Sequence, residues 1–273
     1  MGQCLDIWDK GHRMSNTSLD ENPSVKKYFL VLDVFSVQQP ELGVREIAHQ
    51  LNIPSSTAGR IAIQLRDIGV LSQDQKTQKY RLNSRVLKWA RVFQSTSKLR
   101  ELGLPVLRQL NNSTGETATL TIPYGEFRMI LERIESEHTM RYVVNPGDLM
   151  PLHSGASGKI FLAYMSELQR KLILSSTGLP PFTKNTITDP VLFEQELNKI
   201  AINGFAISRG ERVADVVSAA APVRDANGDV IASINVSGPT ARIDENSLLK
   251  FADLVMSAAM QLSQSLGYYK PEM

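Results

Sequence analysis

The 273-residue sequence contains very little cysteine and no long apolar run. Its single cysteine, Cys4, cannot form a disulfide within the chain, which argues against a secreted disulfide scaffold. No segment approaches the roughly 20 apolar residues that span a bilayer. The first residues resemble neither a signal peptide nor a myristoylation signal. We therefore expect a soluble cytoplasmic protein without membrane attachment.

Histidine is also scarce, with four residues at His12, His49, His138 and His153. They are dispersed and lack the close spacing of metal ligands, so no metal site is predicted. His153 is expected to be a hydrogen-bonded turn residue. The sequence offers no clear acid and base pair and no activated nucleophile, so we predict neither a catalytic residue nor a cofactor.

The basic residues are unevenly distributed, although the net charge of the chain is only +2. Residues 24–93 contain eleven Lys and Arg against five Asp and Glu, whereas residues 94–273 contain seventeen against nineteen. Between Gln75 and Arg91 there are six basic residues and no acidic one. This asymmetry predicts that the N-terminal third contacts a polyanion such as double-stranded DNA, with ordinary solvated side chains as the alternative.

The N-terminal third has the pattern of three short helices, preceded by a polar and aperiodic arm over residues 1–23 that is expected to be flexible. A breaker at Asn52–Pro54 separates the second helix from the third, and Ser55 or Ser56 is expected to cap the third. Two short helices about a tight turn predict a helix-turn-helix over about residues 44–64. The predicted apolar faces are Val25, Phe29, Leu32 and Phe35 in the first helix, Val44, Ile47, Ala48 and Leu51 in the second, and Ile61, Leu65 and Ile68 in the third.

Two strand-like runs follow, Val70–Leu71 and Lys79–Leu82, around a polar tip that is typical of a wing. We therefore predict a winged helix-turn-helix domain over residues 24–84. Apolar residues from Leu82 to Phe93 indicate a linker helix over residues 85–98. The remainder, residues 99–270, is predicted to form a second domain.

This second domain mixes strand-like and helical segments, which makes the predicted fold class α+β. The expected strands are Thr117–Ile122, Arg128–Ile134, Met140–Val144, Val216–Arg224 and Val230–Ser237, the last two flanking a hairpin signal at Asn227–Gly228. The expected helices are Leu99–Leu110, Ser157–Tyr164, Glu167–Leu174, one begun by Asp189–Pro190 and ended by Asn203–Gly204, and one over about Asp244–Leu266.

The third helix carries the side chains that we expect to meet DNA in the major groove. Ser55, Ser56 and Thr57 can reach phosphates or base edges, and Arg60 and Gln64 are the expected long-reach readers. The alternative for Arg60 is a surface salt bridge, for example with Asp67. The other expected contacts are the backbone at Gly59 and the cations Arg45, Lys76 and Lys79, for which simple solvation is the alternative.

The Gly155–Gly158 turn presents backbone N–H groups at the start of a predicted helix, where an anion is favoured. A capping turn without a ligand is the alternative. This is not a Walker loop, because two residues rather than four separate the glycines and Ile160 replaces the magnesium-binding Ser or Thr. It is not a nucleophile elbow either, since Gly158 comes one place too early. The small side chains of Val217–Ala221 leave room for either a ligand or a closely packed helix.

The run Asn145–Ala163, with His153 and the Gly155–Gly158 turn, resembles the signature of IclR-type transcriptional regulators. The resemblance extends over nearly everything from Ser24 to Leu266, in order. Gly59 departs from the pattern, because the family usually has a larger side chain there. The DNA sequence that other family members recognise therefore cannot be assigned to this protein. The further matching positions are Ile53–Thr57, Arg60, Gly69, Tyr80–Leu82, Gly204–Phe205, Gly210–Glu211, Ala221–Val223, Asn227–Gly228 and Ser237–Pro239.

The resemblance implies a winged helix-turn-helix, a helical linker that helps to form a dimer or tetramer, and a GAF-like α/β effector-binding domain. It implies a regulator, expected to be a repressor, of a metabolic operon that responds to a small and often carboxylated effector. An enzyme whose winged helix binds a partner is the alternative, and a winged helix used only for protein interaction is a third possibility. The residues expected to line the effector pocket are Leu149, Gly155, Ala156, Ser208, Asp215, Ser218, Asn235 and Ser237.

Overall fold

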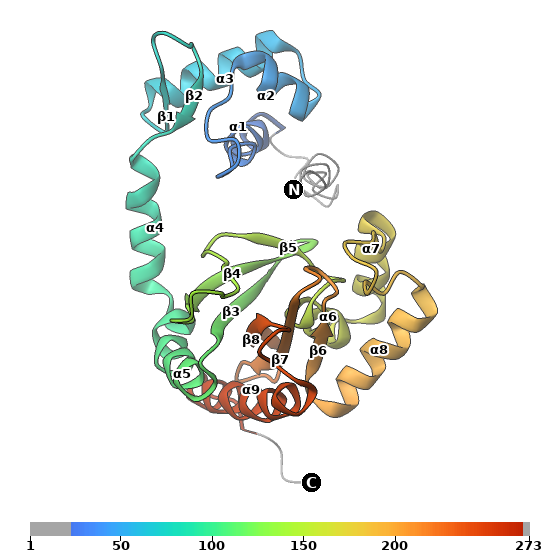
Figure 1. The fold of residues 1–273 in the computed structure, drawn as a ribbon. Coiled ribbons are helices and arrows are strands. Elements are labelled where there is room, and N and C mark those ends of the chain that lie inside the picture. Colours follow the sequence, from blue (N-terminus) through green and yellow to red (C-terminus); the bar gives the residue numbers. More distant parts are fainter. Residues whose placement is uncertain (1–22, 270–273) are drawn as a thin grey trace. The chain divides into compact units, whose positions relative to one another are not determined.

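The computed structural model describes residues 23–269, with side chains from residue 25 onward. The chain divides between Thr96 and Ser97 into two compact units (Figure 1). The predicted arm lies outside the described residues apart from Pro23, which begins the first helix.

The N-terminal unit is a three-helix winged helix-turn-helix followed by one further helix. Its elements are α1 (Pro23–Asp33), α2 (Val44–Leu51), α3 (Ser55–Asp67), β1 (Leu71–Gln73), β2 (Tyr80–Leu82) and α4 (Arg85–Thr96). The antiparallel β1–β2 ribbon is the predicted wing, and a bridge between Leu42 and Tyr80 ties it to the loop before α2. A small core that includes Val31, Ile47 and Ile61 holds these elements together.

The turn between α2 and α3 follows from its residues. Asn52 ends α2 in the left-handed conformation, with φ of 50°, which asparagine tolerates better than most residues. The prediction of a serine cap on α3 is wrong, because Pro54 occupies that position and Ser55 and Ser56 lie in the first helical turn. Three residues predicted to be buried, Val25, Phe29 and Ile68, are instead exposed, because none of the described elements covers their side chains.

The C-terminal unit is built on a six-stranded antiparallel sheet in the order β5-β4-β3-β8-β7-β6. The strands are β3 (Thr117–Tyr124), β4 (Phe127–Ile134), β5 (Leu149–Pro151), β6 (Ala206–Arg209), β7 (Val216–Arg224) and β8 (Val230–Pro239). The predicted strand at Met140–Val144 is wrong. That segment is an irregular connection, and β5 is the strand that pairs with β4.

Helices cover both faces of this curled sheet (Figure 1). α5 (Lys98–Thr114) and α9 (Glu245–Ser265) pack on one face over a core that includes Leu120, Ile234 and Leu262. α6 (Ala156–Tyr164) and α8 (Pro190–Asn203) pack on the other face, and α7 (Glu167–Thr177) lies between them in the chain. As predicted, Asp189 caps α8, and Phe193, Leu197 and Ile200 face inward. Across residues 23–269, none of the helices is both long and apolar enough to cross a membrane.

Candidate DNA-binding and effector-binding sites

The outer face of α3 carries most of the predicted DNA-contacting residues. Ser55, Ser56 and Arg60 are exposed, whereas Thr57 and Gly59 are half-buried at the foot of the helix. Ile63 shares this face and is 43% exposed. It is not among the predicted DNA contacts, because an apolar side chain in the sequence gives no signal for DNA binding. An exposed apolar side chain between polar ones is suited to contact a thymine methyl group.

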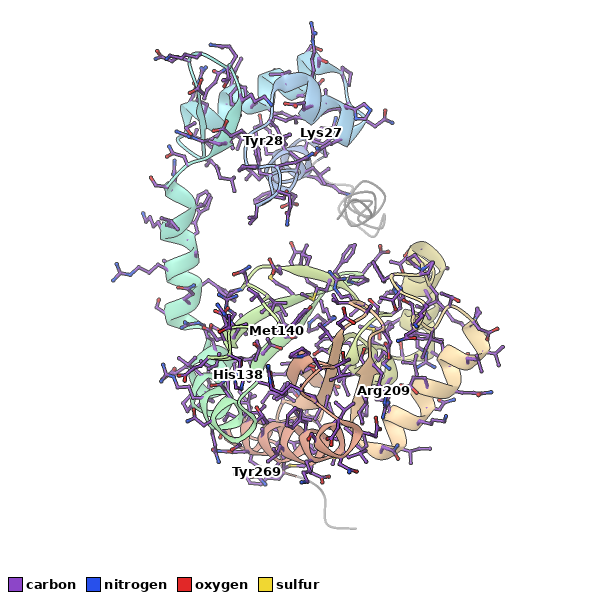
Figure 2. The ribbon with its side chains drawn as sticks, in the orientation of Figure 1. Lys27, Tyr28, His138, Met140, Arg209 and Tyr269 are labelled. Carbon is purple, nitrogen blue, oxygen red and sulfur yellow. The ribbon has the colours of Figure 1, made fainter. Side chains whose placement is uncertain are left out.

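Some of the remaining predicted DNA-contacting side chains already form hydrogen bonds or ion pairs within the protein, and others do not. The hydroxyl of Tyr28, which Figure 2 labels on α1, donates a hydrogen bond to Gln64, and Lys79 lies 3.3 Å from the Glu46 carboxylate. The alternative partner of Arg60 is taken, because Asp67 pairs with Arg66 at 2.8 Å. Arg45, Arg60 and Lys76 make no side-chain hydrogen bond or ion pair within the described part of the chain. Their charges are therefore available to a phosphate backbone.

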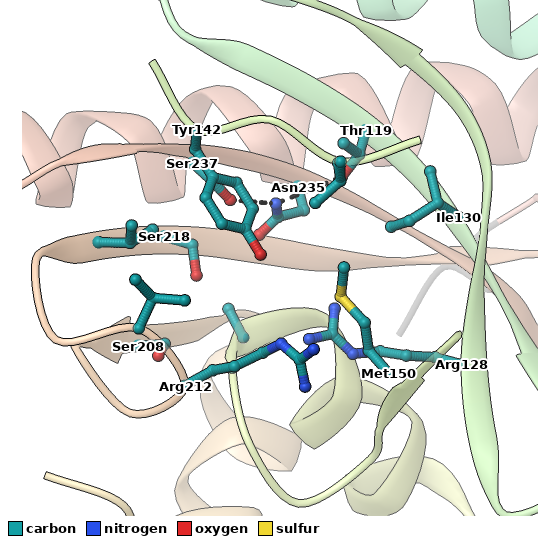
Figure 3. A pocket seen from close by; sticks show the side chains of 15 residues that line it. Thr119, Arg128, Ile130, Tyr142, Met150, Ser208, Arg212, Ser218, Asn235 and Ser237 are labelled. Atoms are coloured by element: carbon teal, nitrogen blue, oxygen red, sulfur yellow. Dashed lines mark hydrogen bonds between the residues drawn. The ribbon is translucent and has the colours of Figure 1, made fainter. Parts of the chain in front are cut away.

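A small, partly enclosed cavity with polar and apolar lining residues lies between the sheet and the start of α6 (Figure 3). Its free volume is about 30 Å³, where a single buried water needs about 10–15 Å³. The structure brings six of the eight predicted effector residues to it: Gly155, Ala156, Ser208, Ser218, Asn235 and Ser237. Thr119, Arg128, Ile130, Tyr142, Val144, Met150, Arg212, Val213 and Val216 complete the lining.

The other two predicted residues, Leu149 and Asp215, do not line the cavity. Pairing with Arg128 turns Met150 inward, and alternation along β5 then turns its neighbour Leu149 away. Asp215 is exposed in the connection before β7, where its backbone carbonyl accepts a hydrogen bond from Thr240. Neither side chain is placed to contact a ligand held in this cavity.

Strand register gathers the polar wall of the cavity. Ser208 pairs with Ser218, and Ser218 pairs with Ser237, which places three hydroxyls in a row across β6, β7 and β8. Asn235 lies two residues from Ser237 and therefore on the same face, opposite Thr119 of β3. Its Nδ2 donates to Thr119 Oγ1 at 3.3 Å and to Ser237 Oγ at 2.6 Å.

Two guanidinium groups lie on the side of the cavity opposite Asn235 (Figure 3). Arg128 is buried and donates from Nη2 to the backbone carbonyl of Ser154 at 3.1 Å. Burial, together with the positive charge of Arg212, lowers the pKa of Arg128 to about 10, so it stays charged at neutral pH. Glycine at 155 makes this possible, because a Cβ there would lie 2.9 Å from Arg128 Nη2 and φ is +87°. Arg128 forms no ion pair with any described carboxylate.

A buried ion network supports the turn at the start of α6. Lys159 is 1% exposed, and its Nζ lies 2.7 Å from each of three acceptors: Glu196 Oε1, Glu211 Oε1 and the carbonyl oxygen of Ile207. The second oxygen of Glu211 accepts the backbone N–H of Gly155 at 3.1 Å. The Gly155 amide that was predicted to meet an anion is therefore already bound by a carboxylate, and the network fixes this wall of the cavity.

His153 is buried beside the same wall, and its Nε2 lies 2.9 Å from the carbonyl oxygen of Pro180. The imidazole ring stacks on Phe182, with the ring centres 5.4 Å apart, and Arg212 lies over the same Phe182 ring. Burial lowers the pKa of His153, and the charges of Arg212 and Arg128 act in the same direction. His153 is therefore hydrogen-bonded, as predicted, and it packs against Phe182, the ring that Arg212 contacts.

Sequence reasoning missed both arginines. The strand pattern gave no signal for Arg128, because Phe127, Met129 and Leu131 form its apolar face and Arg128 lies on the opposite face with Ile130. Arg212 follows Gly210–Glu211 in a loop, where a charged side chain gave no reason to expect a cavity-lining position.

A winged helix-turn-helix in one unit and a partly enclosed cavity lined by two arginines in the other are features typical of a DNA-binding regulator with a ligand-binding domain. Comparison with known proteins agrees with this class. The family profile described as "IclR helix-turn-helix domain" matches residues 24–75, and the one described as "Bacterial transcriptional regulator IclR C-terminal" matches residues 93–264. The chain belongs to the IclR family of transcriptional regulators.

Individual relatives support this assignment. The HTH-type transcriptional regulator BhcR of Paracoccus denitrificans is 35% identical over 85% of this chain and 83% of its own. The crystal structure of the Thermotoga maritima IclR is 28% identical, with a TM-score of 0.67 over 89% of this chain and 98% of that one. An IclR homologue from Microbacterium hydrocarbonoxydans, complexed with 4-hydroxybenzoate, is 24% identical and covers 89% and 98%, with a TM-score of 0.74. The predicted family, α+β fold and regulatory function are confirmed, while the GAF-like relationship stays a prediction.

Proposed function

We propose that the protein binds double-stranded operator DNA through α3 and the wing, and that a small carboxylate in the C-terminal cavity changes this affinity. The observation that supports it most directly is Arg128, a buried guanidinium on the cavity wall that has only backbone acceptors among the described residues. A buried charge without a counter-charge is costly, and an anionic ligand would remove that cost. In this proposal the protein acts in the cytoplasm as the repressor of a metabolic operon.

Gel retardation of the DNA that flanks its own gene tests the DNA-binding part. We expect retardation at low salt and a steep loss of affinity as salt rises, because each released phosphate contact contributes about 0.9 to the logarithmic slope. Arg60→Ala is expected to weaken binding by about 1–3 kcal/mol, since Arg60 is exposed on α3 and free to reach a base edge.

Arg66→Ala is the matched control on the same helix, because Arg66 already binds Asp67 and Gln73 and is expected to change DNA affinity little. Equal losses in the two variants would count against α3 reading DNA through Arg60. Absence of retardation at low salt would remove the DNA-binding proposal itself.

Arg212→Ala tests the effector part. This half-buried guanidinium lines the cavity, and loss of a charge-assisted hydrogen bond is expected to weaken binding of a small carboxylate by about 1.5–3 kcal/mol. Calorimetric titration of the purified protein with short organic acids measures it. Arg209→Ala is the control (Figure 2), because Arg209 is ion-paired with Glu245 and does not line the cavity. Unchanged affinity in Arg212→Ala would contradict this site for the anion.

Self-association is part of the proposal, as a dimer or tetramer. Within the part of the chain that the structure describes, α4 has no fully buried side chain, and it exposes Leu87, Trp89, Val92 and Phe93. Exposed apolar side chains on one helix favour contact with a protein partner. We propose a second copy of the chain as that partner, because helix-turn-helix dimers bind DNA sites made of two half-sites. Sedimentation of the purified protein tests this directly.

The alternative function, an enzyme, would need a reactive group, and Ser157 at the start of α6 is the candidate. Its hydroxyl is buried and has no hydrogen-bond partner within residues 25–269, so the structure provides no base to activate it. We therefore propose a non-enzymatic role for the C-terminal domain. Turnover of an organic acid that Ser157→Ala abolishes would contradict it.

A further inference from the structure

The cavity has two chemically different ends. The end at Asn235 restricts the ligand further than the positive charge of Arg128 and Arg212 does. Asn235 has both amide hydrogens engaged, by Thr119 Oγ1 and Ser237 Oγ. Its Oδ1 accepts no hydrogen bond from any residue that the structure describes. Asn235 is 6% exposed and lines the cavity, so among the described residues this oxygen is left for a donor that enters the cavity, either a ligand or a water molecule.

The hydroxyls around Asn235 supply the opposite kind of group. Thr119 and Ser237 use their oxygens to accept from the Asn235 amide, which leaves their own O–H hydrogens free to donate. Neither hydroxyl donates to another acceptor among residues 25–269. This end of the cavity therefore offers one acceptor and two donors within one side-chain cluster. A hydroxyl group can donate to Asn235 Oδ1 and accept from Thr119 or Ser237 at the same time.

The opposite end of the cavity is positively charged. The cationic side chains around the cavity outnumber the carboxylates by one. Arg128 and Arg212 line the cavity, and Lys159 supports it from behind. Against these three cations stand the carboxylates of Glu211 and Glu196, both bound to Lys159. One negative charge on the ligand restores neutrality, so a single carboxylate fits better than two.

Size limits the rest of the molecule. The free volume of about 30 Å³ is only that of two or three water molecules, so the cavity favours the smallest organic acids. Figure 3 shows the arginines and Asn235 on opposite sides of this space, so a short molecule can present a different group to each.

We infer that the effector is a small hydroxy-monocarboxylate whose carboxylate faces Arg128 and Arg212 and whose hydroxyl is held by Asn235, Thr119 and Ser237. This rests on the proposed function, since it assigns the ligand of the same cavity. The distinguishing element is the hydroxyl, because the arginines alone would accept any small acid.

Calorimetric titration of the full-length protein with matched acids tests this inference. The probes are lactate, propionate and pyruvate, which share a three-carbon skeleton and differ in the group at the second carbon, with glycolate and acetate as a shorter pair. We expect each hydroxy acid to bind roughly 10- to 100-fold more tightly than its unsubstituted partner, because that partner leaves Asn235 Oδ1 without a donor. Malonate and 4-hydroxybenzoate, which test charge and size, are expected to bind more weakly than lactate.

Variants separate the hydroxyl contact from general damage. Asn235→Leu is expected to remove the preference for lactate over propionate while propionate still binds. Thr119→Val with Ser237→Ala is expected to reduce the same preference should Asn235→Leu fail to fold. Ser233→Ala is the control, because Ser233 is a buried hydroxyl on the same strand and does not line the cavity, and its variant is expected to keep the preference.

Equal affinity for lactate and propionate, or tighter binding of pyruvate than lactate, would overturn the hydroxyl assignment and leave the carboxylate proposal standing. Tighter binding of malonate would overturn the single-charge assignment. If none of the acids binds while the protein still retards DNA, the carboxylate effector of the proposed function fails and this inference fails with it.

Discussion

Replacement of Lys159 with methionine is expected to lower the free energy of unfolding of the C-terminal unit by about 3–5 kcal/mol. The Lys159 Nζ uses all three of its hydrogens, on Glu196, Glu211 and the Ile207 carbonyl. Methionine fills a similar volume but leaves the largely buried Glu211 carboxylate without its cation. Urea denaturation followed by far-ultraviolet circular dichroism measures the change.

Two further variants show whether the loss comes from the unpaired charge. Lys171→Met breaks an exposed ion pair with Glu167 on α7 and is expected to cost less than about 1 kcal/mol. Adding Glu211→Gln to Lys159→Met removes the stranded charge and is expected to recover part of the stability. A loss in Lys159→Met no larger than that in Lys171→Met would show that the buried network contributes little.

Gly158→Ala is expected to destabilise the same unit by at least about 3 kcal/mol, at the upper end of the cost of overpacking. A Cβ at this position would lie 2.8 Å from the carbonyl carbon of Leu152 and closer still to its oxygen. The obstacle is backbone, so the first turn of α6 has to move. Since Gly155 and Ala156 in this turn line the cavity, binding of small acids should weaken as well.

Gly59→Ala is the matched control, because it is also a glycine in the early part of a helix. A Cβ there would meet only the two methyl carbons of Val44, at 3.4 and 3.9 Å, so the ordinary helix preference of alanine should stabilise α3 by up to about 1 kcal/mol. Thermal denaturation of both variants is expected to give shifts of opposite sign. A Gly158→Ala protein as stable as the unmodified chain would contradict the close approach of α6 to Leu152.

Local periodicity predicted most helices and strands correctly, because the residues that face the core repeat along each element. Phe193, Leu197 and Ile200 of α8 are buried as expected. The prediction of burial was wrong where burial depends on a neighbouring element. Val25 and Phe29 have helical spacing, yet no described element covers them. Met140–Val144 has the pattern of a strand, but the place beside β4 is taken by β5. Pairing between distant segments is not encoded in local spacing.

For the cavity too, some residues could be predicted from the sequence, and others are identified only by the fold. Resemblance to a known family predicted six residues that line the cavity. The other two predicted residues, Leu149 and Asp215, lie outside its lining, one to three residues along the chain from Met150, Arg212, Val213 and Val216. Arg128 and Arg212 were not found, because a charged residue in a strand or loop is ordinarily exposed. Their importance appears only when the fold brings segments more than eighty residues apart to one wall.

The row of short side chains at Ser208, Ser218 and Ser237 lies on paired strands whose backbone positions are set by the sheet and not by those side chains. Exchange of a hydroxyl for a methyl or an amide in this row would alter which chemical group is recognised while the surrounding architecture persists. Under the proposed function, a single substitution in this row is therefore expected to change which small acid is preferred while the sheet keeps its strand order.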